Sequence, residues 1–189
     1  SVGVTGAFYA FRRELFNPIP ESTLLDDVLI PMQIARKGYR VLFSPGAMAY
    51  DVAPSEPDCE FRRKVRTLAG NFQLFHKHCW LLNPLSNRLW FQTFSHKFLR
   101  LLGPFLLGTA FLANFALLDM AIYRALFTIQ CLIYCAAAIG YYSPAIRNRL
   151  SVVSVPYAFC LLNWSTAVGF YRYVRGEQRV TWKHHHQSA

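Results

Sequence analysis

The sequence predicts an α/β domain followed by an all-α transmembrane region of about three helices. In residues 1–52, short strand-like runs stand on either side of one amphipathic helical segment. After Leu99 come three apolar runs, each with at most one charged residue. Each run has about the 20 residues that an α-helix needs to cross a bilayer. The chain therefore divides into a polar first half and a membrane-like second half.

The first element is predicted from "SVGVTGAFYAFRRELF", residues 1–16. It reads as a strand, a glycine turn and a second short element. Gly3 and Gly6 indicate either simple turns or a close approach of the backbone to a ligand, because glycine serves both purposes. Residues 17–25, "NPIPESTLL", are expected to form a loop, since their prolines interrupt any periodicity.

A helix is predicted within "LLDDVLIPMQIARKGYRV". Asp26 or Asp27 should cap its start, because a carboxylate accepts hydrogen bonds from the free N–H groups of a first turn. Apolar residues then recur at helical spacing, and Gly38 should end the helix. Residues 39–45, "YRVLFSP", predict a short strand, and residues 47–52, "AMAYDV", predict another.

A basic helix is expected over "CEFRRKVRTLAGNFQLF", where Arg62 and Arg66 are four residues apart and share a face. The stretch that follows mixes Trp, His, Arg and Lys, which is typical of an interfacial amphipathic segment. The predicted organisation is a catalytic part at 1–71, an interfacial segment at 72–98, transmembrane helices at 99–118, 122–142 and 150–171, and a basic tail at 172–189.

Composition restricts the function. The net charge is +10, which attracts phosphate in any form, and anionic lipid beside the spans explains much of it. Nucleic-acid binding is disfavoured, because the basic residues flank spans and no recognised binding module is present. The five cysteines include no Cys-x-x-Cys and no zinc-type Cys/His spacing, so neither a metal site nor a disulfide framework is predicted.

The adjacent carboxylates Asp26 and Asp27 suggest catalysis. One Asp would suffice for capping, and a second adds less because the two repel each other. The positive end of a helix keeps a carboxylate ionised, as a general base requires. Clustered arginines beside such a base suit one reaction, in which a hydroxyl attacks a sugar carbon and a nucleoside diphosphate leaves. The base takes the proton and the arginines stabilise the diphosphate.

Three motifs carry a resemblance to a known family: "TGAFYAFRRELF", "LLDDVLIPMQIARKGYRVLFSPGAMAYD" and "FRRKVRTLAGNFQLF", followed by apolar spans. Together they resemble the C-terminal half of a membrane-embedded family-2 glycosyltransferase of the cellulose-synthase-like and hyaluronan-synthase-like group. The resemblance implies part of a nucleotide-diphospho-sugar transferase domain of GT-A type. We therefore expect an incomplete sheet beside the interfacial segment.

The resemblance also assigns roles to residues. Asp27 matches the general base of the family's acidic pair, and Asp26 stands where the family usually has Glu. Gly6 and Ala7 match a glycine turn that lies near the acceptor.

A Gln-x-x-Arg-Trp motif follows in the synthase branch. Arg63 stands at its Gln position, Arg66 at its Arg and Thr67 at its Trp. Arg66 is the expected diphosphate contact and Arg63 a second substrate-binding residue. Since the family's Trp helps to hold a growing sugar chain, its replacement places processive synthesis in doubt.

The resemblance further implies a divalent metal, Mg²⁺ or Mn²⁺, held by an Asp-x-Asp that these 189 residues lack. The expected function is sugar transfer from a nucleotide-sugar donor to a carbohydrate or lipid-linked acceptor in polysaccharide or glycolipid synthesis. The chain is expected to be a fragment that is inactive alone. We expect an integral protein of the bacterial inner membrane, with lipid contacts and a cytoplasmic catalytic part. The alternative is a non-catalytic membrane anchor or transport subunit that binds anionic lipid.

Overall fold

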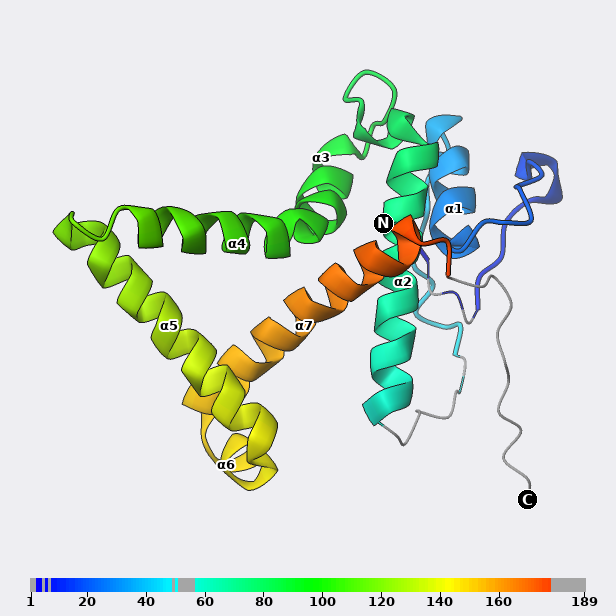
Figure 1. Ribbon diagram of the computed structural model, residues 1–189. Helices are drawn as coiled ribbons and strands as arrows, with labels where there is room; N and C mark the ends of the chain where they lie inside the picture. Colours follow the sequence, from blue (N-terminus) through cyan, green and yellow to red (C-terminus); the bar gives the residue numbers. More distant parts are fainter. Residues whose placement is uncertain (1–2, 5, 7, 49, 51–56, 178–189) are drawn as a thin grey trace. The chain divides into compact units, whose positions relative to one another are not determined.

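The computed structural model describes residues 3–4, 6, 8–48, 50 and 57–177. All of the regular elements in these ranges are helical (Figure 1). They are η1 (Arg13–Leu15), α1 (Asp26–Arg36), α2 (Pro57–Lys77), η2 (Cys79–Leu82), α3 (Trp90–Thr93), the π-helical turn η3 (Phe94–Phe98), α4 (Leu99–Ala116), α5 (Ala121–Tyr142), α6 (Pro144–Arg149) and α7 (Ser151–Val174).

The predicted α/β fold is wrong, because the described residues contain no strand and no sheet, complete or incomplete. A strand is stable only when a neighbouring strand pairs with its backbone N–H and C=O groups. The apolar composition of residues 39–45 favours extended backbone, but no described segment pairs with it. Leu42 and Phe43 are 78% and 89% exposed there. Half of the strand expected at 47–52, namely positions 49, 51 and 52, lies outside the described residues.

The chain forms two compact units, Ser1–Arg100 with Gly169–Ala189, and Leu101–Val168. The first unit is built on α1 and α2. The apolar face predicted for α1 is present, and its Leu29 and Met32 are almost fully buried. Val65 and Ala69 on α2 are fully buried as well. Burying a Val, Leu or Met side chain contributes about 1.5–3 kcal/mol, so these residues form the core of the unit.

Side chains of α2 determine where α1 begins. Gln73 accepts a hydrogen bond from the Leu24 N–H at 3.0 Å and donates one to the Ser22 carbonyl at 2.9 Å. Gly70 allows Leu25 to approach closely, since a Cβ there would lie 2.7 Å from the Leu25 Cγ. The residues just before α1 are thereby fixed against one turn of α2. Arg66 lies one helical turn before Gly70, so it is on the same side of α2.

The last turns of α7 also pack on α2 within the first unit. A Cβ on Gly169 would lie 2.9 Å from the Leu68 Cβ and 3.2 Å from the Val65 carbonyl oxygen. Next to this contact the rings of Phe72 and Phe170 meet edge to face at 5.1 Å. The absence of a side chain at Gly169 therefore lets the two helix backbones approach each other.

The second unit consists of apolar helices with a few internal polar contacts. Gln130 on α5 accepts a hydrogen bond from the Asn114 amide and donates to the Leu107 carbonyl of α4 at 3.2 Å. Arg147 on α6 lies over the Tyr157 ring of α7, 4.5 Å from its centroid. These contacts satisfy polar groups that an apolar environment would not.

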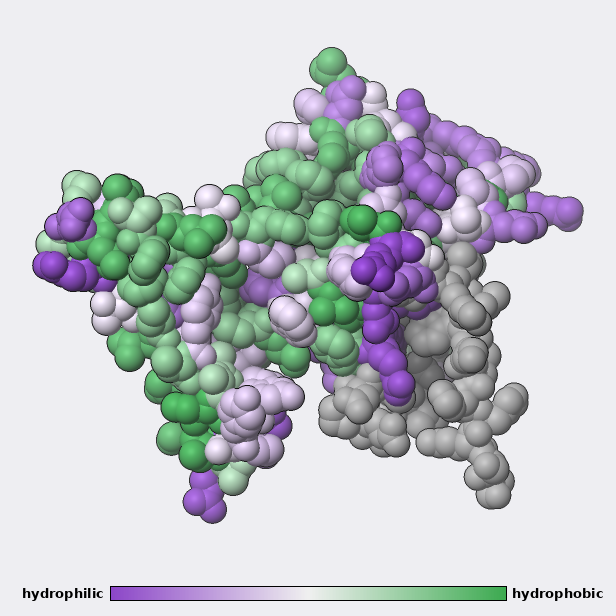
Figure 2. All heavy atoms as spheres, in the orientation of Figure 1, coloured by the Kyte–Doolittle hydropathy of each residue, from purple (hydrophilic) through white to green (hydrophobic). Residues whose placement is uncertain are grey.

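Three helices are long and apolar enough to cross a membrane, as predicted from the three apolar runs. They are Trp90–Ala116, Ala121–Tyr142 and Ser151–Val174. Large apolar side chains on them are exposed, including Leu112 at 67% and Val152 at 78%. In Figure 2 hydrophobic residues cover α4 and α5, while hydrophilic residues gather at the turn between them and around α6. This distribution is consistent with an integral membrane protein.

Candidate functional site

Pro31 shapes the first turn of α1. In a regular helix the carbonyl of Asp27 would accept a hydrogen bond from the N–H of residue 31, but proline has no N–H. The Asp27 carbonyl instead accepts one from the Val4 N–H at 3.2 Å. A segment more than 20 residues earlier in the chain is thereby held against the start of α1.

The held segment brings the glycine turn onto the Asp27 side chain. A Cβ on Gly6 would lie 3.0 Å from Oδ2 of Asp27 and 3.5 Å from its Cγ. A Cβ on Gly3 would lie 3.7 Å from the Asp27 carbonyl oxygen. The prediction that Gly6 accompanies Asp27 in one site is consistent with this contact. Because Gly6 has no side chain, one edge of the carboxylate is left open.

Neither of the two predicted Asp residues occupies the N-cap position. Leu25 occupies the N-cap position without a side-chain capping bond, and Asp26 and Asp27 are the first two residues of the helix. Asp26 is exposed and Asp27 is half-buried. Oδ1 of Asp27 is buried and has no hydrogen-bond partner among the described residues. A buried acceptor of this kind is uncommon and calls for an explanation beyond helix capping.

The electrostatic surroundings of Asp27 act in opposite directions. Burial raises the pKa of Asp27, and the neighbouring charge of Asp26 raises it further. The positive charge of Lys97 and the N–H groups of Asp27 and Val28 lower it. The carboxylate thus holds a proton more readily than an ordinary Asp does, which is the direction expected for a general base.

Arg66 of α2 joins Asp26, Asp27 and Gly6 in one group of neighbouring residues, the Asp27 cluster. Its guanidinium is half-buried, and burial lowers its pKa while the charges of Asp26 and Asp27 raise it. Arg66 therefore lies close enough to both carboxylates to interact with them electrostatically. An arginine held between carboxylates and solvent is suited to bind a phosphate oxygen.

Two residues of the cluster were not predicted. Lys97 lies on the π-helical turn η3, and its Nζ is 3.8 Å from the position of a Cβ on Gly3. Tyr9 follows the glycine turn, and burial and the charges of Asp26 and Asp27 raise its pKa. Lys97 stands 70 residues after Asp27 in the chain, and its basic, aromatic neighbourhood indicated only a membrane interface. A π-helical turn, which often marks a functional site, is a signal that only a structure provides.

The remaining predicted residues separate from this cluster or cannot be placed in it. Arg63 is exposed on α2. The hydrogen bond and charge of Lys64 lower the pKa of Glu60, and the charge of Arg63 lowers it further. Thr67, which stands at the family's Trp position, donates to the Arg63 carbonyl at 3.0 Å. Ala7 lies outside the described residues. The structure thus brings Asp26, Asp27, Gly6 and Arg66 together and leaves Arg63 apart.

The described residues do not fit a divalent metal. No three His, Cys, Asp or Glu side chains in these parts of the chain are grouped so that they could hold one. Asp26 and Asp27 also share their surroundings with Arg66 and Lys97, whose positive charges would repel a cation. We therefore assign no step of the chemistry to a metal at this cluster.

The cluster combines an unsatisfied carboxylate oxygen, two cations and a phenol. Such a set can take a proton from a hydroxyl and can hold an anion beside it.

Comparison with known proteins identifies the family. The sequence profile described as "Glycosyl transferase family group 2" matches residues 1–171 of the chain. No significant match was found among curated proteins or among solved structures. The matched range contains the whole cluster and nearly all of the three apolar helices. The family uses a nucleotide-sugar donor and an acceptor in general, and the cluster's carboxylates and cations are compatible with both. The chain belongs to glycosyl transferase family group 2.

Proposed function

We propose that Asp27 is the general base of a membrane-bound glycosyltransferase that transfers a sugar from a nucleotide-sugar donor to an acceptor hydroxyl. The observation that carries this proposal is Oδ1 of Asp27, which is buried and lacks a hydrogen-bond partner among the described residues. For an acceptor hydroxyl to satisfy that oxygen, substrate binding must first open the contacts that bury it. Family membership supports glycosyl transfer in general.

The residues support the following sequence of events. The acceptor hydroxyl donates a hydrogen bond to Asp27 and gives up its proton as its oxygen bonds to the anomeric carbon. The bond between that carbon and the diphosphate oxygen breaks at the same time, and the nucleoside diphosphate leaves. Arg66 stabilises the negative charge that develops on the leaving group. Burial and Asp26 raise the pKa of Asp27, and the positive charge of Lys97 opposes them by favouring the ionised form.

The finer features of the proposal are the acceptor and the side of the membrane. We propose a carbohydrate or lipid-linked acceptor in polysaccharide or glycolipid synthesis, because the cluster belongs to a chain with three apolar helices. Basic residues concentrate in 59–100, just before and at the start of the first of these helices. The preference of Lys and Arg for the cytoplasmic side supports a cytoplasmic catalytic part.

The test is the variant Asp27→Asn, assayed in membranes that contain the enzyme. Transfer from the nucleotide sugar should fall by about 10²–10⁴, the usual effect of removing a general base. Donor binding should stay near normal, since Asn has nearly the same shape. Asp119→Asn, which changes an exposed carboxylate between α4 and α5, is the control and should keep full activity.

The outcome separates the two functions considered for this chain. A non-catalytic anchor has no turnover that Asp27 could affect. If Asp27→Asn transfers sugar within about twofold of the wild-type rate while Asp26→Asn does not, the base has been assigned to the wrong carboxylate. If neither variant differs from wild type, the cluster is not catalytic.

A further inference from the structure

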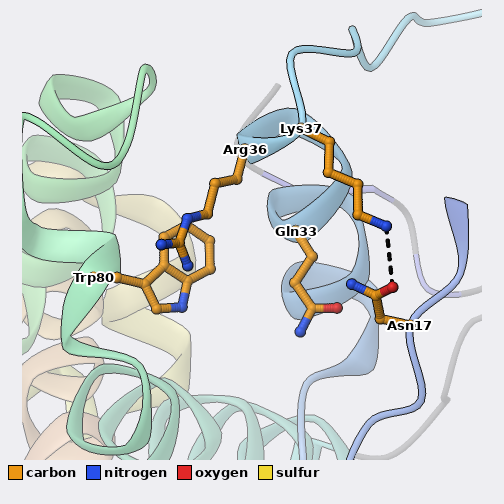
Figure 3. A pocket seen from close by; sticks show the side chains of 5 residues that line it. All are labelled: Asn17, Gln33, Arg36, Lys37 and Trp80. Atoms are coloured by element: carbon orange, nitrogen blue, oxygen red, sulfur yellow. Dashed lines mark hydrogen bonds between the residues drawn. The ribbon is translucent and has the colours of Figure 1, made fainter.

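A polar pocket lies at the C-terminal end of α1, away from the Asp27 cluster. It has a volume of about 390 Å³ and is lined by Asn17, Gln33, Arg36, Lys37 and Trp80 (Figure 3). Asp27 and Arg36 are the second and eleventh residues of α1, so the rise of about 1.5 Å per residue places their backbones roughly 14 Å apart. This pocket is therefore separate from the Asp27 cluster. Its volume is in the range of about 300–1,000 Å³ that is common for small-molecule sites.

The pocket is rich in hydrogen-bond donors. The Arg36 guanidinium lies over the Trp80 ring, 4.9 Å from its centroid. Stacking uses the flat face of the guanidinium. The N–H groups lie in the plane of the guanidinium, point outward from its edge and are left for other hydrogen bonds. Figure 3 shows Arg36 and Trp80 on one side of the pocket and Asn17 on the other, with Gln33 between them. The contact with Trp80 thus restricts the orientation of the exposed Arg36 side chain.

Lys37 completes the donor set. Its Nζ donates to Oδ1 of Asn17 at 3.0 Å and to the Leu15 carbonyl at 3.3 Å. An ammonium has three N–H groups, so one remains for a ligand. Because Oδ1 of Asn17 accepts from Lys37, the amide N–H₂ of Asn17 is the group left for further bonds.

Charge favours an anion in this pocket. None of its five lining residues is a carboxylate. The carbonyl end of α1 carries a partial negative charge of about half a unit, which the two full positive charges outweigh. A phosphate group has the oxygens to accept from a guanidinium edge and an ammonium together.

We propose that this pocket binds a phosphate group, carried either by a membrane lipid or by a soluble ligand. The lipid source has support from position, because Trp80 stands ten residues before the helix Trp90–Ala116 and tryptophan gathers at membrane interfaces. The site is independent of the proposed base, so its test does not use sugar transfer.

The experiment uses the whole 189-residue chain purified in detergent. One arm titrates inorganic phosphate by calorimetry. The other counts phosphatidylglycerol and phosphatidylcholine molecules retained in native mass spectra. The pocket variant is Arg36→Gln with Lys37→Gln. The matched control is Arg12→Gln with Arg13→Gln, two adjacent exposed cations beside the short helix η1.

The pocket variant should weaken phosphate or phosphatidylglycerol binding about ten- to a hundredfold, the usual effect of losing a charge-assisted contact to phosphate. The control should change it less than twofold. Arg36→Lys, which keeps the charge and loses the guanidinium edge, should weaken binding as well. Retention of phosphatidylglycerol alone assigns a lipid source, and binding of inorganic phosphate assigns a soluble one.

Three results would overturn the proposal: no binding of either probe to the wild-type chain, equal losses in the pocket variant and the control, or unchanged binding in the pocket variant. Circular dichroism verifies that the variants keep their helices. If the double variant does not, Arg36→Gln alone decides the matter, because Lys37 then keeps its bonds to Asn17 and Leu15.

Discussion

Replacing Gly6 by alanine probes how closely the glycine turn and the Asp27 carboxylate depend on each other. The new Cβ would lie 3.0 Å from Oδ2 of Asp27 and 3.4 Å from its Cβ. Gly6 is exposed, and its backbone is not among the positive-φ glycines, which in the described ranges are Gly38 and Gly176. Alanine can therefore adopt the backbone conformation of Gly6, and the disturbance is confined to the carboxylate.

The size of the effect follows from that distance. Relief of the 3.0 Å contact to an ordinary one of 3.4 Å displaces the carboxylate by about 0.4 Å. Since a misplacement of about 1 Å can lower a rate about a hundredfold, a displacement of this size should lower kcat about five- to tenfold. The free energy of unfolding should change by less than about 0.5 kcal/mol, because the substituted position is exposed.

The assay compares Gly6→Ala with Gly46→Ala. An added Cβ at Gly46 meets nothing within 4 Å, and Gly46 likewise has no positive φ. Transfer is measured in membranes that contain each enzyme, and helix melting is followed in detergent. Equal kcat for the two variants would refute the placement of Asp27 in the reaction. A loss of kcat that runs in parallel with a lower melting temperature would show instead that the turn serves the fold.

Three further outcomes are expected. Lys97→Met removes a charge that lowers the pKa of Asp27, so the acid limb of the kcat profile should move to higher pH, and Asp26→Asn should move it to lower pH. Asp27→Asn should melt at a higher temperature than wild type near neutral pH. The raised pKa of Asp27 means that ionisation destabilises the folded state, so the difference should vanish as pH falls below the ordinary carboxyl pKa. Gly169→Ala should destabilise the chain by about 1–3 kcal/mol, because its Cβ would lie 3.2 Å from backbone atoms of α2, whereas Gly108→Ala, with open space around it, should not.

The helices were predictable because their signals are local. The α1 segment carries its apolar stripe, its acidic start and Gly38 within a short stretch, and the structure confirms a helix there. The helix predicted from the basic residues around Arg66 is confirmed as part of α2. The three apolar runs were equally evident, because length and composition alone decide whether a helix can span a bilayer.

The sheet could not be predicted from the same kind of signal. The composition of residues 39–45 is typical of a strand, but pairing depends on a second segment far away in the chain. A local pattern reports a preference for extended backbone and contains no information about a partner. Leu42 and Phe43 show the result, since both large apolar side chains remain exposed.

The candidate site was predictable only in part, for a related reason. Asp27 and Gly6 could be named from motifs, and Arg66 from its place in a third motif. The choice between Arg63 and Arg66 depends on which side of α2 meets α1, and that is decided by the close approach of Leu25 to Gly70. Lys97 enters from a helix that begins at Trp90, and nothing near it in sequence refers to an acidic partner.

The adjacent carboxylates at the start of α1 have different surroundings. Asp26 is exposed, and its charge raises the pKa of Asp27 without the burial that Asp27 undergoes. Pro31 frees the Asp27 carbonyl for Val4, and this contact brings the glycine turn to the carboxylate. The surroundings of the Asp27 carboxylate therefore depend on a missing N–H at Pro31 and a missing side chain at Gly6. A residue that supplied either group would bond the carbonyl within the helix or crowd the carboxylate, so these two positions are as much part of the site as Asp27 itself.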